Sequence, residues 1–193
     1  YSVDIKSLYP SVYNHLLIFY DKLHARADQG KNWYNLRACS FYDEFERDSK
    51  IIWGLTADKW AFAYDDQQHY LPSNGYILTS NTLPIKYILG LLNSKVFDYY
   101  FSFIGVMTAG GAYTLKHDTI SKLPFPPVQP DQQQPIIALV GDILAAKQVN
   151  PSADTLTLEK EIDQLVYQLY GLSDEEIAVI EASLKKDGKE KSE

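Results

Sequence analysis

The clearest strand pattern in the chain is KIIWGLTADKWAFAYDDQQHYLPSNGYILT, residues 50–79. It contains three short runs rich in aromatic and β-branched residues, at 50–53, 60–64 and 76–79, which are typical of strands. Asp65-Asp66 and Pro72-Ser73-Asn74-Gly75 separate these runs and are typical of turns. The stretch therefore predicts a small antiparallel sheet.

A helical pattern precedes the predicted sheet. We expect residues 9–30 to form one helix, with Pro10 in its first turn and Gly30 at its end. Five apolar side chains recur at helical spacing and are expected to face a core: Val12, Leu16, Phe19, Leu23 and Ala27.

The chain after the sheet is predicted to be mainly helical. Apolar spacing indicates a helical region over residues 88–103 with a break at Asn93-Ser94, and further helices over 131–149 and 154–170. Gly105 to Ala112 is expected to be flexible, and the prolines at 124–127 to end regular structure. A capping-box pattern at 173–176, Ser-Asp-Glu-Glu, starts a last helix. The predicted fold class is α+β: a helix, then a small antiparallel sheet, then a mainly helical C-terminal half.

Composition indicates a folded chain without a membrane span. Of the 193 residues 46% are hydrophobic and 22% charged, and no apolar run approaches the length of a spanning helix. The single cysteine, Cys39, excludes an intramolecular disulfide and suits a reducing cytoplasm, which is the expected location. The first residue is Tyr1, so we expect the chain to be part of a longer protein.

The net charge of −7 is unevenly distributed. Residues 1–128 hold 12 Lys and Arg against 12 Asp and Glu, whereas residues 129–193 hold 6 against 13. An acidic chain disfavours a nucleic-acid partner. Because the acidity lies in the last third, the neutral part of the chain can still carry a basic face.

Motifs for catalysis and metal binding are missing. The sequence has neither the G-x-G-x-x-G nor the G-x-x-x-x-G-K-[ST] nucleotide-binding pattern, and no nucleophile elbow. The four histidines lack the spacing of zinc ligands. We therefore expect no catalytic residue and no metal site in the chain.

Residues 31–37, Lys-Asn-Trp-Tyr-Asn-Leu-Arg, are a first candidate binding segment. Two cations, Lys31 and Arg37, bracket aromatic rings, a combination that suits phosphate contacts with base stacking or wedging. The alternative is that Trp33 and Leu36 pack between the sheet and the first helix while the cations are solvated. Both interpretations stay open.

Residues 108–117, Thr-Ala-Gly-Gly-Ala-Tyr-Thr-Leu-Lys-His, are a second candidate. Small residues permit close backbone approach, and peptide N–H groups, Thr hydroxyls and Lys116 suit phosphate oxygens. A mobile linker is the alternative interpretation.

Four segments in this order resemble a known family: residues 33–37, 89–101, 120–126 (Ile-Ser-Lys-Leu-Pro-Phe-Pro) and 161–177. Together they are similar to the C-terminal specificity domain of TaqI-like DNA adenine methyltransferases and of type IIG restriction-modification enzymes. The resemblance implies a target-recognition domain that holds DNA while a separate domain methylates a flipped adenine.

The family's catalytic motif, [Asn/Asp/Ser]-Pro-Pro-aromatic, is missing here. The only Pro-Pro pair, Pro126-Pro127, follows Pro124-Phe125 and precedes Val128. We therefore expect the adenine pocket and the methyl-donor loop to lie upstream of Tyr1, in a methyltransferase domain that binds S-adenosylmethionine, with Mg²⁺ if a nuclease is fused. The fragment itself is expected to be non-catalytic and to bind no cofactor.

The resemblance implies double-stranded DNA as the partner of a recognition domain at residues 1–128, followed by an acidic helical subdomain at 129–193. Loops around 56–59 and 108–116 are expected to read bases, and cations to contact phosphates or guanine. The candidate DNA-binding residues are Lys31, Trp33, Arg37, Thr56, Lys59, Thr108, Gly110, Gly111, Tyr113, Lys116 and Lys122.

Two other classes of function are considered. A protein-interaction module of a phage-defence methyltransferase would use the neutral, aromatic surface to bind another subunit. An independent hydrolase is disfavoured because no set of motifs assembles a site.

Overall fold

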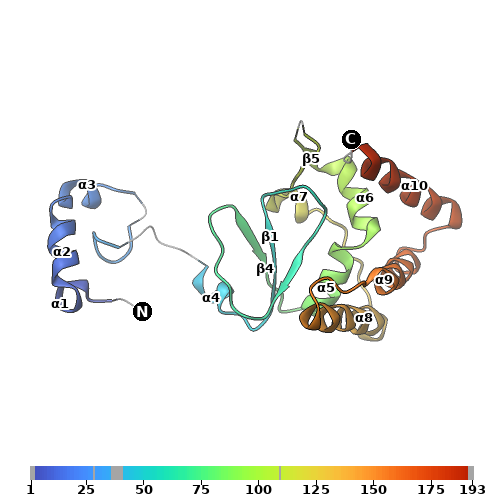
Figure 1. Cartoon of the computed structure of the whole chain (residues 1–193), viewed down its shortest axis with the longest axis horizontal. Coiled ribbons are helices and arrows are strands. Elements are labelled where there is room, and N and C mark those ends of the chain that lie inside the picture. The colour runs from blue at the N-terminus through green and yellow to red at the C-terminus, as the bar shows by residue number, and fades with distance from the viewer. Residues whose placement is uncertain (1–2, 28, 36–40, 109, 191–193) are drawn as a thin grey trace. The chain divides into compact units, whose positions relative to one another are not determined.

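The computed structural model describes residues 3–27, 29–35, 41–108 and 110–190, with side chains described as far as residue 184 (Figure 1). The chain divides into two compact units, Tyr1–Tyr42 and Asp43–Glu193.

The first unit is built from short helices: α1 (Ile5–Leu8), α2 (Pro10–Leu17) and α3 (Tyr20–His24). Asp4 caps α1, because its carboxylate accepts hydrogen bonds from the backbone N–H groups of Lys6 and Ser7. Pro10 lies in the first turn of α2, as the sequence predicts.

The prediction of one helix over residues 9–30 is wrong. The N–H of Ile18 donates to the carbonyl of His15 at 3.2 Å, and the N–H of Phe19 donates to that of Leu16 at 2.9 Å. These tighter three-residue bonds end α2 before α3 begins. The expected apolar stripe is not buried either: Val12, Phe19 and Ala27 are exposed, and Leu16 and Leu23 are half-buried.

The second unit begins with the helical turn α4 (Tyr42–Phe45), which spans the boundary between the units, and then forms the predicted sheet. Strands β1 (Lys50–Gly54), β3 (Ala63–Asp65) and β4 (Gly75–Leu78) pair antiparallel in the order β3-β1-β4. The small antiparallel sheet is therefore confirmed.

The strand expected at residues 60–64 starts only at Ala63. Phe62 bonds instead to a side chain between two helices: its N–H donates to Oδ1 of Asn93 at 2.9 Å, and its carbonyl accepts from Nδ2 at 3.0 Å. The amide of Asn93 thus takes the place of a neighbouring strand.

A second sheet joins three strands of two residues each: β2 (Thr56–Ala57), β5 (Val106–Met107) and β6 (Tyr113–Thr114), in the order β2-β6-β5. The sequence pattern did not predict it. Part of the stretch expected to be flexible, Gly105 to Ala112, belongs to this sheet.

Helices α5 (Ile85–Leu92) and α6 (Lys95–Ile104) follow, and the predicted break at Asn93-Ser94 is confirmed. They lie between the first sheet and the C-terminal helices (Figure 1). After the short helix α7 (His117–Ile120), the prolines at 124–127 end regular structure, as predicted.

The C-terminal helices are α8 (Pro130–Val149), α9 (Leu156–Leu169) and α10 (Asp174–Glu190). The predicted capping box starts α10: Ser173 N–H donates to Glu176 Oε2 at 2.8 Å, and Glu176 N–H donates to Ser173 Oγ at 3.3 Å. The predicted α+β class with a mainly helical C-terminal half is confirmed.

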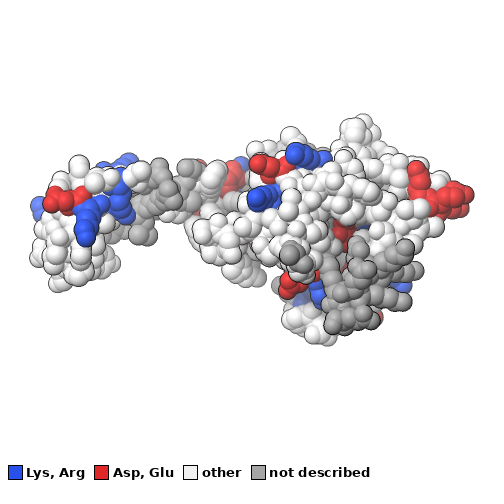
Figure 2. Space-filling model, turned by 90° about the horizontal axis from the view of Figure 1, so that it is seen from above, with Lys and Arg blue, Asp and Glu red and all other residues white. Residues whose placement is uncertain are grey.

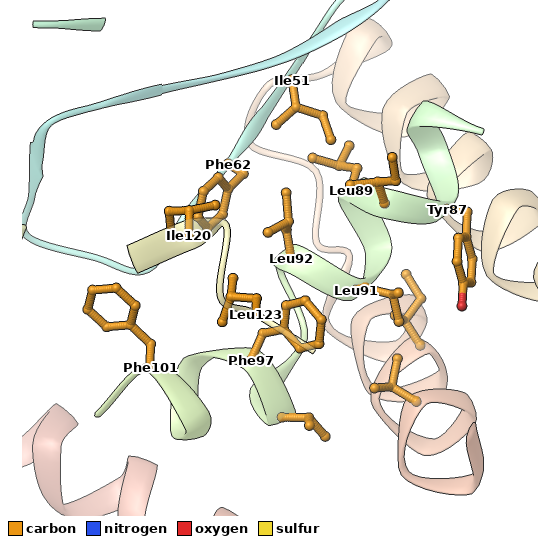
Figure 3. Close-up of a cluster of buried hydrophobic side chains, with 14 of the residues drawn as sticks. Ile51, Phe62, Tyr87, Leu89, Leu91, Leu92, Phe97, Phe101, Ile120 and Leu123 are labelled. Carbon is orange, nitrogen blue, oxygen red and sulfur yellow. The ribbon is translucent and has the colours of Figure 1, made fainter. Parts of the chain in front are cut away.

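One hydrophobic core runs through the second unit (Figure 3). Ile51 of β1 and Phe62 approach Leu92 of α5, while Tyr87 extends from the other side of α5. Ile136 of α8 belongs to the same buried cluster. The division of the chain at residue 128 stays a prediction, and apolar packing continues across it.

Gly90 permits the close approach of α5 to α8. A Cβ built at Gly90 would lie 2.4 Å from Cγ2 of Ile136 and 3.2 Å from Cγ2 of Val140. Gly90→Ala is expected to lower the free energy of unfolding by about 1–2 kcal/mol, because overpacking outweighs the gain in helix propensity. Urea unfolding measures the change.

Gly141→Ala is the matched control on α8. Its Cβ would meet only Nζ of Lys86, at 3.9 Å, which is ordinary contact. Helix propensity should then stabilise the chain by up to about 1 kcal/mol. Destabilisation by Gly141→Ala equal to that by Gly90→Ala would contradict this account of the packing.

Candidate nucleic-acid interface

The second sheet brings together the two loop segments that the sequence predicts to read DNA bases. Thr56 of β2 pairs with Thr114 of β6, and Ala57 pairs with Tyr113. On its other side β6 pairs with β5, where Met107 lies opposite Tyr113. Residues 56–59 and 108–116 are therefore neighbours, although some fifty residues of chain separate them.

The turn between β5 and β6 is closed by hydrogen bonds. Thr108 N–H donates to the carbonyl of Ala112 at 2.8 Å, and Gly111 N–H donates to the carbonyl of Thr108 at 2.9 Å. The Thr108 hydroxyl accepts from the N–H of Ala112 at 3.1 Å. Gly111 has a φ of 77°, a conformation that favours glycine, and the space around the Cα of Gly110 is open. The backbone at Gly110 is accessible to a ligand.

Tyr113 supports the turn between β5 and β6 from the protein interior. Its ring is buried at 7% exposure, and its hydroxyl donates to Oδ1 of Asp98 on α6 at 3.0 Å. Trp53 Nε1 donates to the carbonyl of Leu115 at 2.9 Å, which ties the end of β6 to the first sheet. The Tyr113 side chain is therefore held against α6, and its role as a DNA-binding residue stays a prediction.

Three exposed lysines surround this sheet in sequence. Lys59 follows β2 by two residues, Lys116 follows β6 by two, and Lys122 follows α7 by two. On the face shown in Figure 2, the Lys and Arg side chains of this unit lie among acidic and uncharged ones. That face offers separate cations and not one continuous basic patch, so it can make only a few phosphate contacts.

In the first unit, Lys31 is exposed and Trp33 is half-buried. The Trp33 ring lies 5.7 Å from that of Tyr13, 5.0 Å from that of Tyr20 and 5.4 Å from that of Tyr34. These contacts favour packing against α2 and α3 over a freely exposed stacking ring.

Arg26, which the sequence analysis did not single out, holds the 31–35 segment. Its Nη2 donates to the carbonyls of Trp33 at 3.2 Å and Asn35 at 2.8 Å. Arg37 and Leu36 lie outside the described residues, so the prediction for Arg37 stays a prediction.

A buried ion pair that the sequence did not predict lies at the start of β1. Lys50 Nζ lies 2.6 Å from Oδ2 of Asp65, with side-chain exposures of 0% and 2%. His69 Nδ1 lies 2.8 Å from Oδ1 of the same carboxylate. Burial raises the pKa of Asp65, but the hydrogen bonds from Lys50 and His69 outweigh it and hold the pKa well below its usual range. A lysine at the start of an apolar strand pattern, KIIW, was the available signal.

In the part of the chain that the structure describes, no group of three or more His, Cys, Asp or Glu side chains is placed to hold a metal ion. No described helix is both long enough and apolar enough to cross a membrane.

Comparison with known proteins agrees with the resemblance seen in the sequence. A search of curated proteins finds no match. The family model of the TaqI-like C-terminal specificity domain matches residues 3–125. That range includes both candidate segments, the two sheets and every candidate DNA-binding residue, and it ends before α8. Because the match covers more than half of the chain, the protein belongs to the TaqI-like C-terminal specificity domain family.

Proposed function

We propose that this chain recognises a site in double-stranded DNA and positions the duplex for the methyltransferase domain of a site-specific adenine-N6 DNA methyltransferase or type IIG restriction-modification enzyme. Specificity domains of this family are non-catalytic and recognise DNA in a methyltransferase context. S-adenosylmethionine, and Mg²⁺ if a nuclease is present, would be bound by other domains of that enzyme. The proposed location of the protein is the cytoplasm.

The observation that carries the proposal is the pairing of β2 with β6. It places Thr56 in register with Thr114, so Thr56, Lys59, the open backbone of Gly110 and Lys116 all belong to this one small sheet and to the segments that directly adjoin its strands. Hydroxyl, ammonium and peptide N–H groups are the usual partners of DNA phosphates and base edges. The proposed contacts are Lys31, Arg37, Thr56, Lys59, Thr108, Gly110, Gly111, Lys116 and Lys122, with Trp33 and Tyr113 supporting them.

Binding to duplex DNA should be weak and dependent on salt. Non-specific dissociation constants of about 10⁻⁴ to 10⁻⁶ M are expected at physiological salt. Lys116→Ala should weaken binding to all duplexes alike and reduce the salt slope by about one unit, because one phosphate contact is lost. Fluorescence anisotropy between about 50 and 200 mM salt measures both quantities.

Lys160→Ala is the matched control, because Lys160 is an exposed lysine on α9, outside the family match. It should leave affinity and slope unchanged. If the unaltered chain shows no duplex binding at low salt, the proposal fails and a protein-interaction module becomes the better interpretation.

A further inference from the structure

A cavity of about 340 Å³ lies where α5, α8 and α9 meet. Its walls are mainly apolar, with Leu89 of α5, Val140 and Leu144 of α8 and Ile162 of α9 among the lining residues. Trp60 is also among the lining residues, and its Nε1 donates to the carbonyl of Leu92. This volume and this apolar lining are typical of sites for small molecules.

Charged side chains line the cavity beside the apolar ones. Asp163 is buried at 6% exposure, and its Oδ1 accepts from the N–H of Lys95 at 2.9 Å. Lys95 Nζ lies 3.3 Å from Oδ2 of Asp163 and 2.7 Å from Oε1 of Glu181. Glu159 adds a further carboxylate, which accepts from the hydroxyl of Thr155 at 2.7 Å.

The charged side chains that line the cavity indicate which class of ligand it would bind. Two carboxylates line the cavity, those of Asp163 and Glu159. Among the described residues that line it, the only ammonium is that of Lys95. This ammonium already pairs with a third carboxylate, that of Glu181. Burial raises the pKa of Asp163, so Lys95 does not fully compensate for the desolvation of this carboxylate. A second cation would lower that penalty, whereas an anion would be repelled.

From this geometry we infer that the cavity binds a small organic cation. The apolar body of the ligand lies against Leu144, Val140 and Trp60, and its protonated amine lies near Asp163 and Glu159. The Trp60 ring adds a favourable contact for a cation. Because α5 lies within the family match and α8 and α9 lie beyond it, the ligand would join the two parts of the chain.

Three probes with one ring system and different charges test the inference: tryptamine, neutral 3-ethylindole and indole-3-acetate. Isothermal titration calorimetry on the whole chain should show tryptamine binding about tenfold more tightly than 3-ethylindole, because a charge-assisted hydrogen bond is added. Indole-3-acetate should bind most weakly. At equal probe concentration, tryptamine should raise the melting temperature most and indole-3-acetate least.

Glu159→Gln should weaken tryptamine binding about three- to tenfold and leave the affinity for 3-ethylindole unchanged. Glu161→Gln is the matched control, because Glu161 is exposed on the same helix and does not line this cavity. Leu144→Trp should fill the cavity and abolish binding.

Equal affinities for the three probes, or no tryptamine binding, would overturn the inference. Tryptamine binding that survives both Glu159→Gln and a folded Leu144→Trp variant would also overturn it. DNA binding is measured separately through Lys116, so either proposal can fail without the other.

Discussion

Lys50→Met is expected to lower the free energy of unfolding by about 3–5 kcal/mol, the range found when one partner of a buried ion pair is removed. Lys50 is fully buried, and its ammonium bonds both to Asp65 and, at 2.8 Å, to the carbonyl of Phe45 in α4. The variant leaves the Asp65 carboxylate in the interior without its nearest positive charge. Denaturant unfolding at neutral pH measures the loss.

Lys59→Met is the matched control, since Lys59 is exposed and should change stability by less than about 0.5 kcal/mol. Adding Asp65→Asn to Lys50→Met should recover part of the loss, because no charge is then left unpaired. A double variant less stable than Lys50→Met alone would contradict the assignment of the loss to an unpaired carboxylate.

The stability lost through Lys50→Met should be smaller in acid than at neutral pH. The pKa of Asp65 is lower in the folded chain than its ordinary value of 3.8. The ion pair therefore contributes its full stability above about pH 5, and that stability is lost as the pH falls through the folded pKa. The difference between the unaltered chain and Lys50→Met should accordingly shrink in acid.

Phe97→Ala is expected to destabilise the chain by about 3–5 kcal/mol, the range for a fully buried phenylalanine. Phe97 is buried on α6, and its ring lies 5.1 Å from that of Phe125 and 6.3 Å from that of Tyr170. Phe97 is therefore the point at which three of the segments that resemble the family meet: residues 89–101, 120–126 and 161–177. Thermal and urea unfolding should both show the loss.

Phe103→Ala on the same helix is the matched control. Phe103 is 68% exposed, and its main ring contact is with Tyr99 at 5.0 Å. We expect a loss below about 1 kcal/mol. If the two variants lost equal stability, α6 would not be oriented with Phe97 toward the core.

The sequence predicted the elements whose signals are local and strong. The capping box at Ser173 and the break at Asn93-Ser94 depend on neighbouring residues only, and both are confirmed. The helix expected over residues 9–30 depended on apolar spacing alone. That spacing continues through Phe19, where the backbone turns, so periodicity could not locate the end of α2.

The candidate interface was predictable by residue type but not by arrangement. Thr56 and Lys116 were selected from their own segments, but the two-residue strands that join these segments have no detectable period. Tyr113 was selected with its neighbours, and only tertiary packing shows that its ring is buried. The Lys50–Asp65 pair was hidden for the same reason, since pairing across strands is not visible in one sequence.

The reciprocal bonds between Asn93 and Phe62 have a consequence for how a sample ages. Hydrolysis of the Asn93 amide would replace its Nδ2 donor with a second acceptor facing the carbonyl of Phe62, so one attraction would become a repulsion. Asn93 is exposed, and a small residue, Ser94, follows it. Deamidation at this position would loosen the first sheet from the junction of α5 and α6, and stored protein would then lose stability without any cleavage of the chain.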